Sequence, residues 1–363
     1  MSYGSAPITS PLQSLATAWR VLSRLGGPQT MAAGVTDFLA TPQAPPSQQI
    51  VSQQMLATTL MEIGVPVDTS TLALAESFSR VGVAITQPNI SDGRGLLKRD
   101  PEITPASIAL ASALGAPKSD GVLRALSAVI RGLPESGNVS DEALEQLTVS
   151  LGNGREAEAT ATQLKGLLSR LGHSIENKII VREAIDSDPR LSLLALSSRS
   201  DRRSEGANQL ASNIEGQQVL NQAASGHGPA APFYFGFYAA GPDGRNIPVE
   251  IQVKREEQRR GGKHHSDDDD VTLTTLRISP ERLGQLEVRL AATESGAMRC
   301  DVRAAQLGTM RLMRRHAPDL ADSLTAAGWQ VQRVTVTQEK EFPPLWFGGE
   351  ILAQPRSLLD RKV

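Results

Sequence analysis

The sequence predicts an α+β domain at the C-terminal end of the chain, preceded by a mostly α-helical, partly disordered N-terminal region. From Leu276 to Thr337, apolar residues first alternate with polar ones, then recur at every third or fourth position, and then alternate again. The first pattern is typical of half-buried strands and the second of an amphipathic helix. Most of the aromatic residues also follow residue 230. We therefore expect a mixed sheet of about four to six strands with one covering helix.

The first two strands of this domain are separated by a short turn. The first strand ends at Pro280, because proline offers no N–H group to a sheet, and Gly284 lets the chain reverse. In the second strand, Glu287 and Arg289 should point into water or toward a partner. The apolar positions of the two strands are Leu276, Ile278, Leu286, Val288 and Leu290.

A third strand, a helix and a fourth strand follow. The third strand alternates around Cys300, whose thiol should therefore be buried. A helical stripe runs from Leu307 to Leu324, and Pro318 should kink or restart this helix. Gly328 is placed to end the helix, after which residues 329–336 return to strand.

Two further strands precede these. Aromatic residues alternate over residues 233–238, and Val249, Ile251 and Val253 form the expected hairpin partner across the turn sequence PDGRN. Both strands should join the C-terminal sheet.

The order of these elements, and specific residues in them, resemble the C-terminal domain of the flagellar hook-length control protein family. The family pattern is a leucine-rich strand, a Pro-Glu-x-Leu-Gly turn, a second strand, a helix with a Pro-x-Leu step, and an Ala-Gly before a valine-rich strand. The matching residues here are Leu276, Ile278, Pro280, Glu281, Leu283, Gly284, Leu286, Val288, Leu290, Pro318, Leu320, Ala327, Gly328, Val334 and Val336.

The region before residue 230 has a different composition. Several short helices should begin at a polar cap that follows an apolar residue, and the clearest caps are Asp68, Thr104 and Ser140, about 35 residues apart. The composition divides the chain into a disordered arm at 1–50 with a possible export signal, a small helical domain at 51–151, a helical spacer and linker at 152–229, the α+β domain at 230–340 and a tail at 341–363.

Composition argues against several classes of function. A net charge of −2 provides no overall field that would attract nucleic acid or an anionic membrane. No apolar run approaches the ~18 residues of a membrane helix, and the first residues lack a secretory signal, so we expect a cytoplasmic protein without membrane insertion. A substrate of type III export would look the same. The sequence has no Gly-x-Ser-x-Gly elbow and no glycine-rich phosphate loop after a strand, so it does not predict an enzyme. We interpret Gly93-Arg94-Gly95 and Gly152-Asn153-Gly154 as turns.

Two kinds of polar cluster could form binding sites. His264-His265 with residues 267–270 resembles a metal site, but adjacent histidines in a glycine-flanked loop lack a rigid frame, so we expect neither metal nor cofactor. Basic residues gather at 255–263 and on the last helix. They could form a solvated face, a docking face for an acidic protein segment or, least in keeping with the neutral charge, a nucleic-acid site.

The resemblance implies a protein that is cytoplasmic before export, then secreted through the flagellar channel, and that controls hook length. It would switch type III export from hook-type to filament-type substrates by touching the cytoplasmic switch domain of the export gate, and it would meet hook and hook-cap proteins. The alternative is a non-enzymatic interaction module of another secretion or envelope system. The expected partner-facing residues are Pro280, Glu281, Leu283, Gly284, Arg289, Arg311, Arg314 and Arg315. The first four could instead serve only as a turn that fixes two strands.

Overall fold

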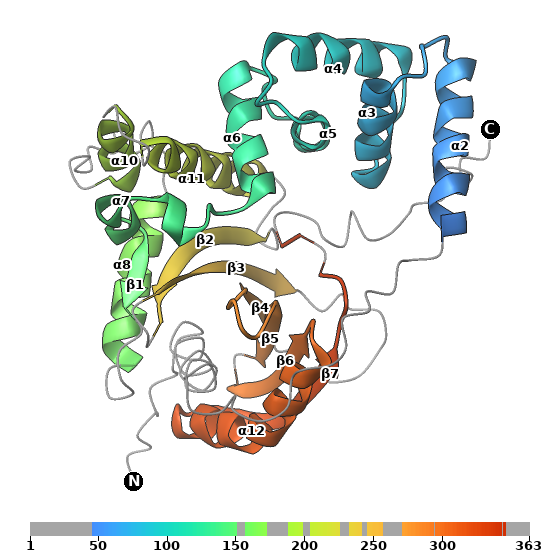
Figure 1. Ribbon diagram of the computed structural model, residues 1–363. Helices are drawn as coiled ribbons and strands as arrows, with labels where there is room; N and C mark the ends of the chain where they lie inside the picture. The colour runs from blue at the N-terminus through green and yellow to red at the C-terminus, as the bar shows by residue number, and fades with distance from the viewer. Residues whose placement is uncertain are drawn as a thin grey trace.

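A computed structural model describes residues 46–150, 157–172, 188–198, 204–225, 232–241, 245–256, 271–293, 295–342 and 344–345. Figure 1 shows a curved sheet with helix α12 at one end, helices α7, α8, α10 and α11 at the other, and a row of helices α2 to α6 above. The expected helix within the first 50 residues, the loop with His264-His265, the turn Gly152-Asn153-Gly154 and the tail aromatics Trp346 and Phe347 lie outside the described residues.

The sheet has seven strands in the order β1 to β7. Strands β2 to β6 pair in antiparallel fashion with their neighbours, whereas β1 with β2 and β6 with β7 are parallel. The strands are β1 (Thr148–Ser150), β2 (Phe233–Ala240), β3 (Asn246–Glu256), β4 (Val271–Ile278), β5 (Leu286–Thr293), β6 (Ala297–Ala304) and β7 (Gln330–Gln338). The α+β prediction is confirmed, with one more strand than expected.

The helical region surrounds a core of its own. Its members are α2 (Pro46–Glu62), α3 (Thr69–Arg80), α4 (Gln87–Arg99), α5 (Pro105–Leu114) and α6 (Asp120–Arg131). Phe78, Leu110 and Leu126 are among its buried residues, and Tyr234 of β2 reaches the same cluster. Aromatic residues contribute little to this core, which consists mainly of leucine, alanine, isoleucine and valine.

The three predicted helix caps are confirmed. Asp68, Thr104 and Ser140 each accept a hydrogen bond from the backbone N–H three residues later, which satisfies a donor that has no partner inside the helix. The third cap begins α7 (Asp141–Glu145), which follows a short 3-10 turn, η1 (Ser136–Asn138).

The interpretation of Gly93-Arg94-Gly95 as a turn is wrong, because these residues lie inside α4. A Cβ atom on Gly93 would lie 2.9 Å from Cδ2 of Leu74. The glycine therefore reflects the close packing of α4 on α3 and not a reversal of the chain.

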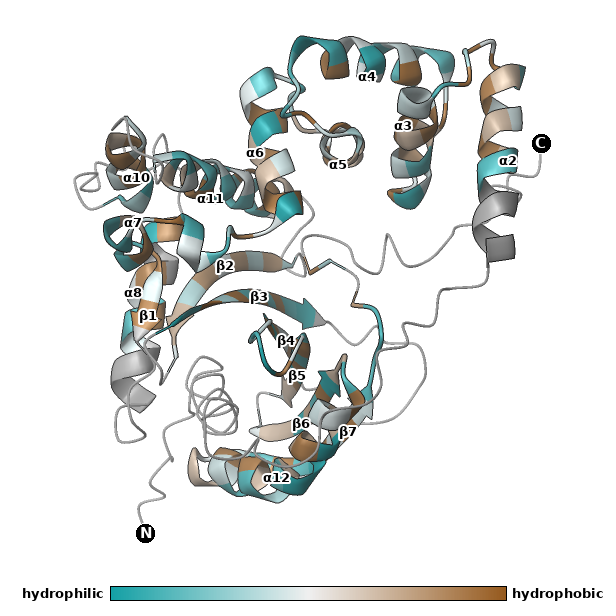
Figure 2. Cartoon of the chain, viewed as in Figure 1, coloured by the Kyte–Doolittle hydropathy of each residue, from teal (hydrophilic) through white to brown (hydrophobic). Residues whose placement is uncertain are grey.

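The remaining helices are α8 (Ala157–Gly172), α10 (Pro189–Ser197), α11 (Ser204–Ser225) and α12 (Leu307–Ala326). Helix α12 continues through Pro318 and covers one face of the sheet with Met310, Met313 and Leu324. Figure 2 shows hydrophilic residues on its side away from the strands. Gly328 ends this helix as predicted, with a positive φ of 94°.

The outer edge of β2 is closed by side chains of α11. The Asn221 side chain bonds the N–H and C=O of Tyr234 at 2.8 and 2.9 Å, and the Gln217 side chain bonds those of Gly236 at 3.1 and 3.3 Å. Gln217 and Asn221 are four residues apart, which is a rise of about 6 Å along the helix, and two residues of strand span nearly 7 Å. The two side-chain amides can therefore bond alternate residues of β2.

Strand β1 closes the rest of this edge, although the spacing of Leu144 and Leu147 after the Ser140 cap is helical. The helix stops at Glu145, the C=O of Leu147 accepts the N–H of Tyr238 at 2.9 Å, and the next three residues pair with β2. The pairing requirement of a distant strand, which periodicity cannot reveal, overrides the local helical pattern.

Helices α6 and α11 cross in unusually close contact. A Cβ atom on Gly216 would lie 2.2 Å from the carbonyl oxygen of Ala125 and 2.5 Å from Cγ2 of Val129. Asn213, one turn earlier on α11, donates to the carbonyl oxygen of Ala128 at 3.0 Å. This crossing joins the core of the helical region to the helix that borders the sheet.

We predict that Gly216→Ala lowers the free energy of unfolding by about 1–3 kcal/mol, because the added methyl group must push two helices apart. Gly166→Ala is the matched control, since Gly166 lies exposed on α8 with no atom within 4 Å of its Cβ position. It should raise stability by up to about 1 kcal/mol. Urea unfolding followed by far-UV circular dichroism measures both, and equal stabilities would contradict the close crossing.

Candidate functional site

The two faces of the sheet differ in chemistry. One face is apolar and lies under α12. On the other face, Glu250, Arg277, Glu287 and Arg303 are direct neighbours on strands β3 to β6. Charges of opposite sign therefore alternate across four strands, the arrangement that favours cross-strand pairing.

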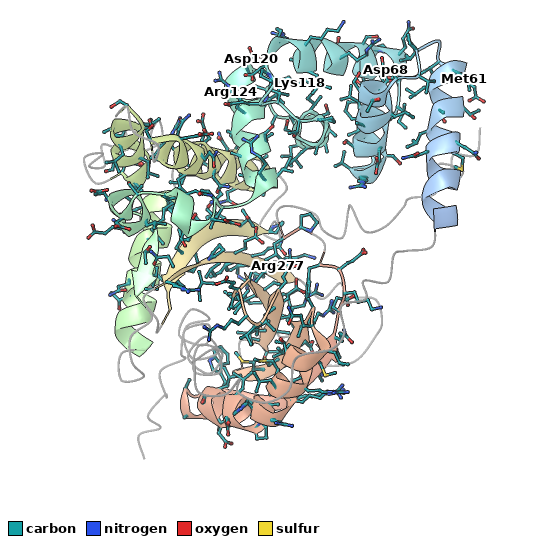
Figure 3. All side chains as sticks on the ribbon, viewed as in Figure 1. Met61, Asp68, Lys118, Asp120, Arg124 and Arg277 are labelled. Atoms are coloured by element: carbon teal, nitrogen blue, oxygen red, sulfur yellow. The ribbon has the colours of Figure 1, made fainter. Side chains whose placement is uncertain are left out.

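The centre of this row is buried. Arg277 Nη2 lies 2.5 Å from Glu287 Oε2, and the two side chains are 5% and 0% exposed. Arg289 Nε donates to the other carboxylate oxygen of Glu287 at 2.8 Å, and Glu250 lies 3.9 Å from Arg277. Arg277 is seen at the middle strands in Figure 3. The expectation that Glu287 faces water or a partner is wrong, because its partners are two arginines of the same sheet.

The segment after β7 returns across this polar face. The Phe342 ring lies over the Arg277 guanidinium at 5.4 Å, a cation–π contact, and Gln252 donates to the carbonyl oxygen of Leu345 at 2.7 Å. Leu345 is buried in the cluster that includes Tyr234. These tail residues therefore dock on the domain itself, and Figure 1 shows the segment running up from β7 toward β2.

The Pro280–Gly284 turn packs against the start of α12. Leu283 is buried in the sheet core, and its C=O accepts the Thr309 hydroxyl at 2.8 Å. Gly284 has a positive φ of 67°, and a Cβ atom there would lie 2.8 Å from the Gln306 side chain. Within the turn, Glu281 is exposed and pairs with Arg245 at 2.6 Å. The turn therefore fixes two strands and the helix, and Glu281 and Arg282 are its exposed side chains.

The four predicted arginines separate into two places. Arg289 lies beside the row of charges on the polar face, where it is half-buried and pairs with Glu287. Arg311, Arg314 and Arg315 are exposed on one side of α12, because their spacing of three and four residues keeps them together. Arg314 Nε donates to the carbonyl oxygen of Val336 in β7 at 3.2 Å. The structure thus groups the helix arginines beside the last strand and away from Arg289.

Residues 261–344 match the family model described as flagellar hook-length control protein FliK. This segment is similar to the flagellar hook-length control proteins. The match covers β4 to β7 and α12, and it supports a role in flagellar hook-length control. No curated protein and no solved structure gave a match to the chain.

Within the matched segment, the thiol of Cys300 is shielded from solvent. Cys300 is buried, and burial with Asp301 nearby raises its pKa from 9.0 to about 12. Over the described part of the chain, no three histidine, cysteine or acidic side chains gather as a metal site, and no helix is long and apolar enough to cross a bilayer.

Sequence reasoning missed the Arg277–Glu287 pair and its cover by Phe342. A signal was present, because Glu250, Arg277 and Glu287 each stand between apolar residues of a strand. Pairing them required the register of three strands, which one sequence does not supply.

We predict that Glu287→Leu lowers stability by about 3–5 kcal/mol, because it leaves Arg277 as a buried charge without its closest partner. The double variant Arg277→Leu with Glu287→Leu should lose much less than the two single changes together. Glu281→Ala, which removes an exposed pair in the same domain, should change stability by no more than about 1 kcal/mol. Additive effects in urea unfolding would contradict a coupled buried pair.

The thiol of Cys300 should resist modification in the folded chain. With a pKa of about 12, it stays protonated at neutral and mildly alkaline pH, and only the thiolate reacts. Ellman's reagent should label it slowly under native conditions and rapidly in denaturant. Equal rates in the two conditions would show that the strand opens readily.

Proposed function

We propose that this protein regulates the flagellar type III export apparatus by switching export from hook-type to filament-type subunits. The C-terminal domain would act by contact with the cytoplasmic switch domain of the export gate. The family match over residues 261–344 carries this proposal.

The N-terminal portion would report hook length by passing through the growing structure unfolded. About 225 extended residues reach on the order of 700 Å, at ~3.3 Å each. The helical core contains one aromatic residue, Phe78, among its buried side chains from α2 to α6 and lacks cross-links, which suits a segment that must unfold during export. Helices α2 to α6 are packed, so passage requires unfolding rather than the threading of an already extended arm.

A chain that lacks residues 230–363 tests the proposal. Without the C-terminal domain, export should remain on hook subunits, so hooks should exceed their normal length and carry no filament. Electron microscopy of isolated hook–basal bodies measures hook length, and the full chain expressed at the same level is the control.

The deletion also removes the strand that covers α11, so the truncated chain could be degraded. An immunoblot of cells and culture medium should therefore show that the truncated chain is present and exported. Normal filaments on hooks of normal length would rule the proposal out.

A further inference from the structure

The strands at the two edges of the sheet differ in whether their outward backbone groups have hydrogen-bond partners. The β2 edge is closed by β1 and by the amides of Gln217 and Asn221. At the other edge, no element of the described chain pairs with the outer side of β7, a strand of nine residues at the border of the sheet (Figure 1). An uncovered edge strand is a ready template for another strand.

The outward backbone groups of β7 can be identified. The N–H of Glu339 donates to the carbonyl oxygen of Ala304. Backbone groups on one side of a strand recur at every second residue, so the N–H and C=O groups of Thr337 and Thr335 also point toward β6. Val334, Val336 and Gln338 therefore direct their N–H and C=O groups outward. The Arg314 contact with the carbonyl oxygen of Val336 agrees with this assignment. A register shift lies earlier, between Met298 and Arg299, so the second half of β7 is the regular stretch.

Positive charge flanks this edge on both faces of the sheet. On the α12 side lie Arg311, Arg314 and Arg315, and on the polar face Arg299 and Arg333 are register neighbours. All five arginines are exposed, and within the described chain none forms an ion pair with a carboxylate. The exposed carboxylate of Asp301 on β6 accepts the Thr335 hydroxyl, and Arg303 is paired with Glu339 at 3.7 Å.

We propose that an extended, acidic segment of a partner protein binds alongside β7 as an eighth strand of the sheet. Its backbone would bond the outward N–H groups of Val334, Val336 and Gln338 and the C=O groups of Val334 and Gln338, because the C=O of Val336 already accepts from Arg314. Its carboxylates would meet the arginines on either side. A second copy of this chain fits less well, because edge-to-edge pairing would bring the same arginines together. Nucleic acid would supply negative charge but no strand backbone.

This inference rests on the proposed function for the identity of the partner, the switch domain of the export gate. The first experiment is therefore amide hydrogen exchange of the full chain with and without the purified switch domain. In the free chain, Val334 and Val336 should exchange fast, while Thr335 and Thr337 are protected by β6. Binding should slow the first pair.

Charge and backbone variants then test the two parts of the site separately. Arg314→Glu with Arg333→Glu should weaken binding of the switch domain at least tenfold, whereas the matched control Arg131→Glu, exposed at the end of α6, should not. Val334→Pro removes one outward N–H, a change that an edge strand tolerates, and should weaken binding similarly.

The outcomes separate the two proposals. Binding without new protection at Val334 and Val336, or protection of both amides already in the free chain, overturns the strand-addition inference and leaves the export role intact. If the switch domain does not bind and the deletion strain makes normal filaments, the proposed function fails.

A defined probe tests the edge without the gate. A decapeptide of alternating valine and glutamate should slow exchange of Val334 and Val336, and its lysine counterpart should not. Equal effects of the two peptides, or no effect of either, would overturn the acidic-strand inference.

Discussion

The architecture depends on the requirement that the backbone of β2 have hydrogen-bond partners on both sides. A buried N–H or C=O without a partner costs about 1–3 kcal/mol, and the outer side of β2 carries several such groups. Gln217 and Asn221 of α11 and the short strand β1 satisfy them. Helix α11 also crosses α6 at Gly216, so this one edge ties the helical region to the sheet.

Much of the C-terminal fold could be predicted because its signals are local. Period-two alternation located strands β2 to β6, three-to-four spacing located α12, and glycine or cap residues marked the ends. The polar caps Asp68, Thr104 and Ser140 were equally readable, since each bonds within its own first turn. Predictions were wrong where the local structure depends on a contact with a residue far away in the sequence. Gly93 signalled close packing and not a turn, and residues 148–150 became a strand only because β2 needs a partner.

The features of the candidate surface likewise fall into those set by local spacing and those set by distant contacts. The basic side of α12 follows from helical spacing, and the Pro-Glu-x-Leu-Gly turn follows from its residue types. The bare edge of β7 and the buried pair of Arg277 with Glu287 depend on strand order and register. Burial of that pair under Phe342 also explains why the polar face of the central strands is not open to a partner, which leaves the exposed arginines near β7.

The first three strands of the sheet lie outside the family match, which begins at residue 261. Strand β4 pairs with β3 along its full length, so the sheet continues beyond the matched residues. A chimera that exchanged only residues 261–344 with another hook-length control protein would pair a foreign β4 with the native β3. The side chains of β1 to β3 would then pack against a strand of different sequence. An exchange that preserves the sheet must also include β1, β2, β3 and the helix α11 that closes the edge of β2.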